Sequence, residues 1–355
     1  MKVLLFTRYG RLGASSRVRS LQYLPFLRSR GVEVSVKPLL SDSYLQALYK
    51  GGPRWREVIK GYCSRVVALL GAWRFDVVMI EKELFPFLPA LAERFLRLIR
   101  VPYIVDYDDA LFHRYDRHNN RWVRKLLGRK IDSVMCHSVT VIAGNEYLAE
   151  RARDAGARKV EIIPTVVDLE RYRLKIQREA GASIVGWIGT PETSRYLKPL
   201  LPVFEAIKKD VPVRFVAVGA NPEEFEDTPV EVWPWSEASE VESVSQFDVG
   251  IMPLIDSPWE RGKCGYKLIQ YMACGVPVVA SPVGVNVEIV NPPENGCLVR
   301  SNEDWDRALR YLLQADSSVR ELMGEAGYAL VKSRFSLEAQ APQLLRVISE
   351  AARGA

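Results

Sequence analysis

The sequence lacks three features, each of which would point to a particular class of protein. Its five cysteines have no Cys-x-x-Cys spacing, so a disulfide scaffold or a zinc site is not expected. No stretch reaches the roughly 18–20 apolar residues that span a bilayer, and the apolar run before Arg8 is too short for a signal peptide. The Gly-x-Gly-x-x-Gly phosphate fingerprint of dehydrogenases is also missing. We therefore expect a protein of the reducing cytoplasm that is soluble or lies on a membrane without crossing it.

The composition is that of a globular protein, with 48% hydrophobic and 26% charged residues. A length of 355 residues exceeds what one hydrophobic core usually holds, about 250–300 residues, and so favours two domains. The net charge of +6 and a pI near 9.0 suggest an anionic partner. Nucleic acid, anionic lipid and nucleotide phosphate all fit that charge.

Strand-like and helix-like segments alternate along the chain. The apolar run 2–6, a helical segment 17–31 and the run 32–39 form a βαβ unit. Further strands are predicted at 76–81, 103–108, 138–144 and 160–165, and a second series at 183–189, 213–219, 247–254, 276–281 and 296–299. The polar stretch 166–182 separates the two series. This pattern predicts two parallel α/β domains, 1–175 and 176–335, facing across a cleft, with a C-terminal helix 336–355 packing back on the first.

Ligands of such sheets bind outside the carboxyl ends of the strands, and acidic residues follow one of these ends. Asp106, Asp108 and Asp109 lie at the end of the strand 103–108. Carboxylates there suit sugar-hydroxyl recognition, general base chemistry or a metal, but no second carboxylate or histidine cluster supports a metal. Asp109 is alternatively a helix cap.

The segment 263–284 joins a basic, glycine-containing loop to an apolar helix. Lys263, Gly265 and Lys267 lie in or just inside this loop, where the helix N-terminus exposes unpaired N–H groups. Lysine in a first helical turn is electrostatically unfavourable, which favours a phosphate site over a solvated face. The alternative is that both lysines are simply solvated.

Two other strand-to-helix loops carry similar features. After the strand 183–189, Gly189 and Thr190 precede Arg195, which could reach a phosphate at the helix start. After the first strand, Gly10 and Gly13 lie among arginines and could admit a ligand to the backbone. A tight turn followed by solvated charge explains this second loop equally well.

A basic segment, 114–130, surrounds Trp122 with arginines, lysines and leucines. An amphipathic helix of this composition can lie on an anionic membrane surface. The alternative is a solvated charged face. A nucleic-acid partner is not expected, because no base-reading helix or aromatic stacking set accompanies the charge.

The chain resembles, over nearly its whole length, the GT-B glycosyltransferases of the family 4 type. The segments 143–172, 247–254, 266–290 and 295–299 carry the resemblance by their order and spacing, and 15–27 and 105–112 resemble a subset of that family. The resemblance implies two Rossmann-like domains, the second holding the nucleotide-sugar and the first the acceptor. It also implies retention of anomeric configuration with no metal and no further cofactor.

Residue roles carried over from that family are expectations. Gly13 would border the donor phosphates, Arg195 matches the family's lysine position, Glu288 would contact the nucleotide or its ribose, and Lys263 and Lys267 would flank the diphosphate. The predicted catalytic residues are Asp108, Asp109, Arg195 and Lys267. The predicted donor-binding residues are Gly10, Gly13, Gly189, Thr190, Lys263, Cys264, Gly265, Tyr266 and Glu288, and no metal ligand is predicted.

The sequence also departs from the family at four positions. The family's paired glutamates are Gly262 and Gln270 here, so the first acid is missing. Thr190 replaces a basic residue, and Asp108 aligns with a histidine often found near the reacting sugar. These differences leave open whether Asp108 takes over the role of that histidine.

The sequence therefore predicts a retaining, metal-independent glycosyltransferase of polysaccharide or glycolipid biosynthesis, acting on a glycan or lipid-linked acceptor. It would be cytoplasmic, and either soluble or peripheral on the inner face of the membrane. One alternative is a nucleotide-sugar epimerase or hydrolase of the same fold. Another is a degenerate module that binds nucleotide without turnover.

Overall fold

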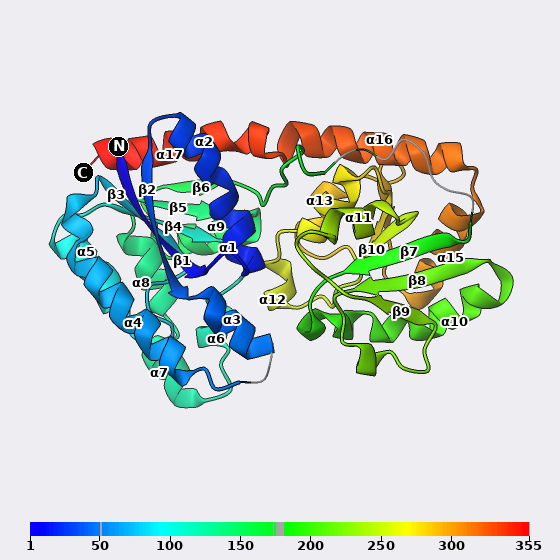
Figure 1. Ribbon diagram of the computed structural model, residues 1–355, viewed down its shortest axis with the longest axis horizontal. Coiled ribbons are helices and arrows are strands. Elements are labelled where there is room, and N and C mark those ends of the chain that lie inside the picture. The colour runs from blue at the N-terminus through cyan, green and yellow to red at the C-terminus, as the bar shows by residue number, and fades with distance from the viewer. Residues whose placement is uncertain (50–51, 173, 175–180, 355) are drawn as a thin grey trace. The chain divides into compact units, whose positions relative to one another are not determined.

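The computed structural model describes residues 1–49, 52–172, 174 and 181–354, and it divides into two compact units (Figure 1). Unit 1 contains Met1–Val166, Gly262–Cys264 and the C-terminal residues from Leu337 onward. Unit 2 contains Val167–Arg261 and Gly265–Ser336. The predicted domain boundary between 175 and 176 lies outside the described residues. So do residues 173 and 175–180 of the predicted linker 166–182.

Unit 1 is built on a six-stranded parallel sheet in the order β2-β1-β3-β4-β5-β6. Its strands are short, buried apolar runs, as expected of a parallel sheet covered on both faces. The strands are β1 (Lys2–Tyr9), β2 (Glu33–Leu40), β3 (Val77–Glu81), β4 (Tyr103–Tyr107), β5 (Thr140–Ala143) and β6 (Val160–Ile162).

Alternate residues of these strands face two separate cores. Leu4, Ile80 and Val105 pack beneath α4 to α9, whereas Leu5, Met79 and Ile104 pack beneath α2 and α17. The helices of unit 1 are α1 (Ala14–Arg19), η1 (Leu21–Tyr23), α2 (Leu24–Ser29), α3 (Asp42–Tyr49), α4 (Trp55–Leu70), η2 (Ala72–Arg74), α5 (Leu91–Leu98), α6 (His113–Asp116), α7 (Arg121–Leu127), α8 (Lys130–His137), α9 (Glu146–Asp154) and α17 (Leu337–Arg353).

Unit 2 repeats the architecture with a different strand order, β12-β11-β10-β7-β8-β9. Its strands are β7 (Ser183–Ile188), β8 (Val213–Val218), β9 (Val230–Trp233), β10 (Val249–Met252), β11 (Val278–Ala280) and β12 (Gly296–Leu298). The helices are η3 (Pro191–Tyr196), η4 (Lys198–Leu200), α10 (Leu201–Asp210), η5 (Pro222–Glu224), α11 (Glu240–Ser245), α12 (Pro258–Arg261), α13 (Tyr266–Ala273), α14 (Asn286–Ile289), α15 (Asn302–Gln314) and α16 (Ser317–Arg334). The predicted fold class, two Rossmann-like α/β domains, is confirmed.

Two local predictions were wrong, and one strand was not predicted. The segment 17–31 is not one helix, because Pro25 at the start of α2 cannot continue an earlier helix and α1 ends at Arg19. The helix predicted from Tyr196 begins as an α-helix only at Leu201, after two 3-10 turns with Pro191 and Pro199 in their first turns. The edge strand β9 was not predicted, because its alternating pattern is only half-buried.

No helix in the described part of the chain is both long and apolar enough to cross a membrane.

Candidate active site

Each sheet has a switch point, a pair of neighbouring strands from which the chain continues in opposite directions across the sheet. Ligands of parallel α/β sheets bind at this point, outside the carboxyl ends of the strands. In unit 1 this point lies between β1 and β3, which end at Tyr9 and Glu81. In unit 2 it lies between β7 and β10, which end at Ile188 and Met252. The candidate site residues of each unit gather at these edges.

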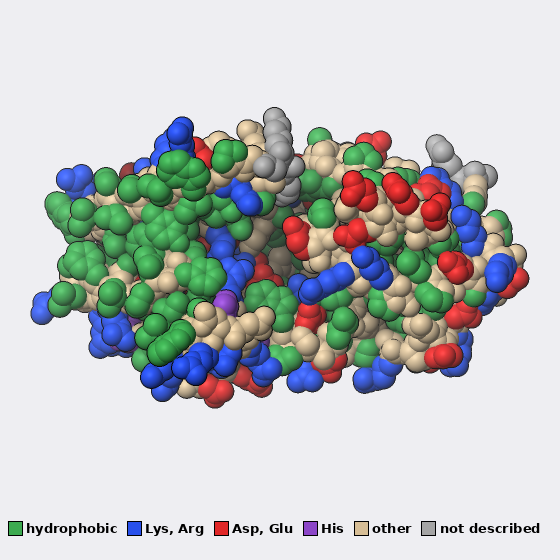
Figure 2. Space-filling model, turned by 90° about the horizontal axis from the view of Figure 1, so that it is seen from below, with side chains coloured by type: hydrophobic (Ala, Val, Ile, Leu, Met, Phe, Trp, Pro, Cys, Tyr) green, Lys and Arg blue, Asp and Glu red, His purple; other side chains and the backbone are tan. Residues whose placement is uncertain are grey.

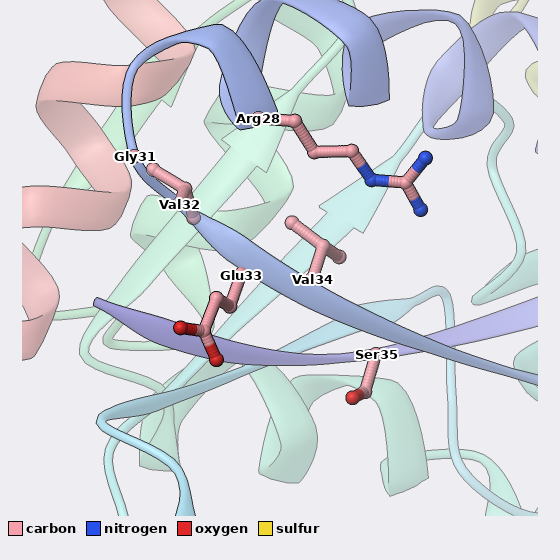
Figure 3. A pocket seen from close by; sticks show the side chains of 6 residues that line it. All are labelled: Arg28, Gly31, Val32, Glu33, Val34 and Ser35. Atoms are coloured by element: carbon pink, nitrogen blue, oxygen red, sulfur yellow. The ribbon is translucent and has the colours of Figure 1, made fainter.

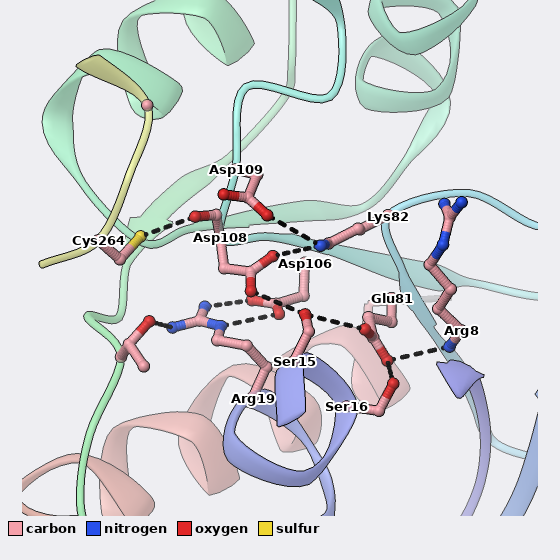
Figure 4. Close-up of polar contacts among 12 residues, drawn as sticks. Arg8, Ser15, Ser16, Arg19, Glu81, Lys82, Asp106, Asp108, Asp109 and Cys264 are labelled. Atoms are coloured by element: carbon pink, nitrogen blue, oxygen red, sulfur yellow. Dashed lines mark hydrogen bonds and ion pairs between the residues drawn. The ribbon is translucent and has the colours of Figure 1, made fainter. Parts of the chain in front are cut away.

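A buried lysine occupies the switch point of unit 1. Lys82 follows β3 with a φ of 67°, a left-handed backbone conformation that non-glycine residues rarely adopt. Its Nζ lies 2.9 Å from Oδ1 of Asp108 and 3.2 Å from Oδ2 of Asp109, beyond the end of β4 (Figure 4). The two predicted catalytic carboxylates are therefore held on one ammonium group.

This ion pair sets the charge state of Asp108. Burial alone would raise the pKa of Asp108, but the Lys82 ammonium and the Arg19 guanidinium hold it below its ordinary value. The same carboxylates raise the pKa of Lys82 against the effect of burial. The pair is thus ionised over the whole neutral range.

Helix α1 contributes two serines to this network. Ser15 Oγ donates to Oδ2 of Asp108 at 2.9 Å, and Ser16 Oγ donates to Oε2 of Glu81 at 2.6 Å. Burial raises the pKa of Glu81, which also accepts the backbone N–H of Arg8 at 3.0 Å. The serines therefore fix the start of α1 against the ends of β3 and β4.

Two glycines bring the first loop close to this edge. Gly13 is the N-cap of α1, and a Cβ there would lie 2.3 Å from Cβ of Tyr9. A Cβ at Gly10 would meet Oδ1 of Asp42 at 2.4 Å. Both predicted donor-binding glycines therefore allow a close backbone approach within unit 1 itself.

Arg19, on α1, binds Asp106, the buried carboxylate of β4 that lies two residues before Asp108. Its guanidinium makes a two-pronged pair with Asp106, with Nε 3.0 Å from Oδ2, and Nη1 donates to the carbonyl of Ile163 at 2.9 Å. Both side chains are almost fully buried. Asp106 is accordingly a structural partner of Arg19 and faces the core.

The segment Gly262–Cys264 packs into unit 1 although it is distant in sequence. Asn145 Nδ2 donates to the carbonyls of Gly262 at 3.1 Å and Lys263 at 3.0 Å, and Cys264 Sγ lies 3.1 Å from the carbonyl of Asp108. Burial raises the pKa of the Cys264 thiol to about 12, which makes it a poor nucleophile. Cys264 therefore acts as a packed donor to the backbone of Asp108.

The absence of a family glutamate at Gly262 has a steric reason. A Cβ on Gly262 would lie 2.5 Å from Cβ of Ala110 and 2.8 Å from its backbone nitrogen. The second departure, Gln270, is buried in α13 and donates to the hydroxyl of Tyr172 at 2.7 Å. Gln270 therefore belongs to the core of unit 2.

In unit 2, a short loop and a 3-10 helix follow β7. Thr190 and Thr193 form a reciprocal capping box, with the backbone N–H of Thr190 3.1 Å from Oγ1 of Thr193. A Cβ on Gly189 would meet the Trp187 ring at 2.2 Å and Oγ1 of Thr193 at 2.8 Å. The loop is therefore held close to the end of β7.

Arg195 lies at the end of the same 3-10 helix, and its exposed guanidinium is anchored on one side. Its Nη2 lies 3.2 Å from the hydroxyl of Tyr196 and 3.7 Å from Oε1 of Glu260. The Tyr196 hydroxyl itself donates to buried Glu260. This arrangement orients Arg195 while leaving most of its side chain exposed.

The loop before α13 has the geometry expected at an anion site. Gly265 is the N-cap of this eight-residue helix with a φ of 64°, and a Cβ there would lie 2.5 Å from Cδ1 of Ile289 in α14. The ammonium of Lys267, in the first turn, lies over the Trp187 ring at 5.4 Å from its centroid. Tyr266 is half-buried, and Glu288 is exposed on α14, beside the start of α13.

Two pockets of unit 1 lie elsewhere. One is lined by Arg28, Gly31, Val32, Glu33, Val34 and Ser35, at the amino end of the edge strand β2 (Figure 3). The other lies beside it, along the beginnings of β1 and β2 and the end of α4. Both are at the opposite end of the sheet from the Lys82 network.

The predicted site residues thus separate into two groups. Unit 1 holds Gly10, Gly13, Asp108, Asp109, Lys263 and Cys264, and unit 2 holds Gly189, Thr190, Arg195, Gly265, Tyr266, Lys267 and Glu288. Their roles stay predictions. Sequence reasoning did not single out Lys82, Ser15, Glu81 or Asn145. The only signal that could have found them is that each lies at the carboxyl end of a predicted strand or in the loop after it.

Within the described residues, no group of three or more His, Cys, Asp or Glu side chains is arranged to hold a metal ion.

The sequence matches known families over both units. Residues 4–165 match the family described as "Glycosyl transferase 4-like domain", and residues 182–315 match "Glycosyl transferases group 1". The D-inositol 3-phosphate glycosyltransferase of Segniliparus rotundus is 28% identical over 56% of this chain. That match spans about half of the relative, 49% of its length.

Solved structures share the fold at low sequence identity. Sucrose-phosphate synthase from Thermosynechococcus elongatus superposes with a TM-score of 0.73 at 15% identity, covering 100% of both chains. Anabaena Alr3699/HepE, solved in complex with UDP, gives 0.69 at 15% identity, covering 99% of this chain and 100% of that one. These structures are similar to this chain in fold. The family matches to both units show that the chain is a glycosyltransferase of the group 1, family 4 type, and the solved structures show that its two Rossmann-like units are those of the GT-B fold.

Proposed function

We propose that the chain transfers a sugar from a nucleotide-sugar donor to a hydroxyl of a glycan or lipid-linked acceptor, with retention of anomeric configuration. Unit 2 would hold the donor and unit 1 the acceptor. The observation that carries this proposal is the start of α13. There a left-handed glycine leads into a first turn containing Lys267, at the carboxyl edge of a Rossmann-ordered sheet.

The donor phosphates would bind at the start of α13, where the positive end of the helix dipole lies. Gly265 gives the backbone close access, and the Lys267 ammonium and Arg195 guanidinium would neutralise charge on the leaving diphosphate. Thr190, Gly189, Tyr266 and Glu288 of unit 2 would complete the donor contacts. Similar structures of Anabaena Alr3699/HepE contain UDP and UDP-glucose, which supports a donor of this class.

The acceptor would meet the carboxylates of unit 1. The acceptor oxygen forms the new bond to the anomeric carbon as the bond to the diphosphate breaks, and the hydroxyl proton passes to a donor phosphate oxygen. Asp108 is ionised and held by Lys82 and Ser15. Its carboxylate would therefore accept hydrogen bonds from sugar hydroxyls and form no covalent bond to the sugar. Asp109, half-exposed on the same lysine, would do the same.

Leaving-group stabilisation by these basic groups would replace a metal in this scheme, and the nucleotide-sugar would be the only cofactor-like molecule required. We also propose that the protein works in the cytoplasm, where nucleotide-sugars are the donors.

Thermal shift against UDP, GDP, ADP, TDP and CMP, each measured with and without EDTA, tests the donor site. A ligand that binds only the folded state raises the melting temperature by mass action. We expect one nucleoside diphosphate to give a selective shift that survives EDTA. A shift that disappears with EDTA contradicts the metal-free site, and no shift with any nucleotide contradicts the proposed function.

A further inference from the structure

The outer side of α4 in unit 1 is apolar where a surface helix would normally be polar. Trp55, Ile59, Val66 and Leu70 are exposed at intervals of four and seven residues, which places them along one stripe, and Val67 is exposed beside it. Val67 is 70% and Leu70 63% exposed. Figure 2 shows hydrophobic side chains gathered over this face of unit 1.

The opposite side of the same helix is already used for the core. Leu69 packs into the main core of unit 1, and the buried Arg65 guanidinium donates to the carbonyl of Leu84 at 3.0 Å. Helix α4 is therefore apolar on two sides, one packed and one open. An exposed apolar group of this size on a surface helix usually marks an interaction site.

Neighbouring elements continue the exposed apolar stripe. Trp73 in η2, Phe87 and Leu88 before α5, and Leu91 and Leu98 on α5 are all exposed, Leu98 to 79%. The inner sides of α4, α5 and α7 pack into the same core, on one face of the sheet. Their outer sides therefore point away from that sheet together, as the labels α4, α5 and α7 in Figure 1 show.

Helix α7 adds a basic, aromatic rim. Trp122 and Leu126 are exposed one turn apart, and Arg121 and Lys125 lie over the Trp122 ring, at 5.2 and 5.7 Å from its centroid. The ring and the alkyl stems form one apolar surface with the charges at its margin. Tryptophan and lysine or arginine are the residues that anchor proteins at a lipid–water interface.

The charges on this surface have one sign. On α4, η2, α5 and α7, every charged side chain of the exposed class is basic, including Arg56 and Lys60 on α4 and Arg94 and Arg97 on α5. The two acidic side chains of these elements are less exposed to solvent than the basic ones, since Glu57 is half-buried and Glu93 is buried. An apolar centre with a uniformly basic margin is complementary to anionic lipid.

We propose that this outer apolar face, made by the exposed side chains of α4, η2, residues 87–88, α5 and α7, docks unit 1 onto an anionic lipid bilayer. The apolar side chains would enter the interfacial region, and the arginines and lysines would reach lipid phosphates. A second copy of the chain fits less well, because a twofold contact through this face would bring basic margins together. The inference goes beyond the proposed reaction and does not depend on it.

Vesicle sedimentation tests the proposal with the full chain and no donor present. We compare phosphatidylcholine vesicles with vesicles containing about one third phosphatidylglycerol, at low and high salt. Binding should be at least tenfold stronger to the anionic vesicles and should weaken with salt, since each basic residue near the surface contributes about fivefold. Equal binding to both vesicles, or none to either, overturns the proposal.

Matched variants locate the surface. Val67→Glu with Leu70→Glu should lower vesicle binding at least tenfold, because it places two carboxylates in the apolar stripe. Leu322→Glu, at an equally exposed leucine of unit 2, should leave binding unchanged. Equal loss in both, or retained binding in the double variant, contradicts the assignment.

A probe at a native residue gives a reading that does not depend on how any variant folds. Cys63 is exposed on α4, four residues from Ile59 and three from Val66 on the apolar stripe. In a Cys136→Ser, Cys297→Ser background, an environment-sensitive dye on Cys63 should shift to the blue with anionic vesicles. A blue shift that instead follows protein concentration without lipid, together with a dimer in light scattering, identifies a second copy as the occupant and overturns the lipid proposal.

Discussion

The two units share one architecture, but different chemical groups lie at the carboxyl ends of their strands. In unit 1 the edge is filled by charges that satisfy one another, with Lys82 between Asp108 and Asp109. In unit 2 the edge is formed by a left-handed glycine, a capped threonine loop and the first turn of α13. The first arrangement fixes carboxylate oxygens in place, which suits hydroxyl groups. The second presents backbone N–H groups and basic side chains, which suits phosphate.

The surfaces of the units also differ, in how their exposed apolar side chains are distributed. Most of the exposed large hydrophobic side chains of unit 1 lie on α4, η2, residues 87–88, α5 and α7. Those described in unit 2 lie on separate elements and are Trp235, Ile255, Val287, Tyr311 and Leu322. Scattered apolar side chains are normal on a protein surface, but a contiguous group is not. A shared fold therefore places the edges, and the side chains decide what each edge and face can bind.

Lys267→Ala should have the largest effect on function and almost none on stability. We expect a loss of about 10²–10³ in the transfer rate, because one group aimed at the developing negative charge is removed. Lys209→Ala is the matched control, since it removes one exposed lysine of unit 2 at the end of α10, which leads to the amino end of β8. Similar losses in both variants would contradict a specific role for Lys267.

Asp108→Asn should have the largest effect on the stability of unit 1. It leaves the ammonium of Lys82 mostly buried, and we expect the free energy of unfolding to fall by about 3 kcal/mol, at the low end for a broken buried pair because Asp109 still faces Lys82. The exposed pair of unit 2, Arg214 with Glu231, is the control, and Glu231→Gln should cost less than about 1 kcal/mol.

The pH dependence of this loss has a definite sign. The pKa of Asp108 is lower in the folded protein than in the unfolded chain, so its carboxylate stabilises the fold above an unfolded pKa of about 3.9. That contribution disappears as pH falls through the lowered folded pKa. Urea unfolding should therefore show the full difference between native protein and variant at neutral pH and a smaller one in acid. A difference that grows in acid would contradict this ionisation.

The contrast between the carboxyl ends of the strands in the two units is only partly predictable from the sequence. The buried strands were predictable because strands covered on both faces are continuous apolar runs between turn residues. The Lys82 network was not, because Ser15 and Asp108 are 93 residues apart and only the folded sheet brings them together. The same holds for Cys264 and Asp108, separated by 156 residues. Gly265 and Lys267 were predictable because their signal is local.

Gly265→Ala tests the backbone geometry of the unit 2 edge. Alanine is strained at a φ of 64°, and its Cβ would press on Ile289, so we expect a loss of about 1–2 kcal/mol in unfolding free energy and weaker nucleotide binding. Gly181→Ala is the control, because it meets no neighbouring atom within 4 Å. Calorimetry that finds the two variants equally stable would contradict the geometry.

Arg195→Ala should have the smallest effect. The side chain is 64% exposed and only partly anchored by Glu260, so we expect unchanged stability and a nucleotide affinity weakened by about tenfold or less. Isothermal titration with the diphosphate selected by thermal shift measures this directly. A loss larger than that of Lys267→Ala would reverse the ranking of the two residues.

Sugar transfer itself is the most direct test of the central claim that this chain is a working group 1 glycosyltransferase. Radiolabelled nucleotide-sugars are supplied one at a time with EDTA and an extract of glycans and lipids, and label in the acceptor fraction is measured. We predict that one donor labels a product, and that Lys267→Ala loses this while Lys209→Ala keeps it. Consumption of a donor with no labelled acceptor, or no consumption of any donor, would contradict the account.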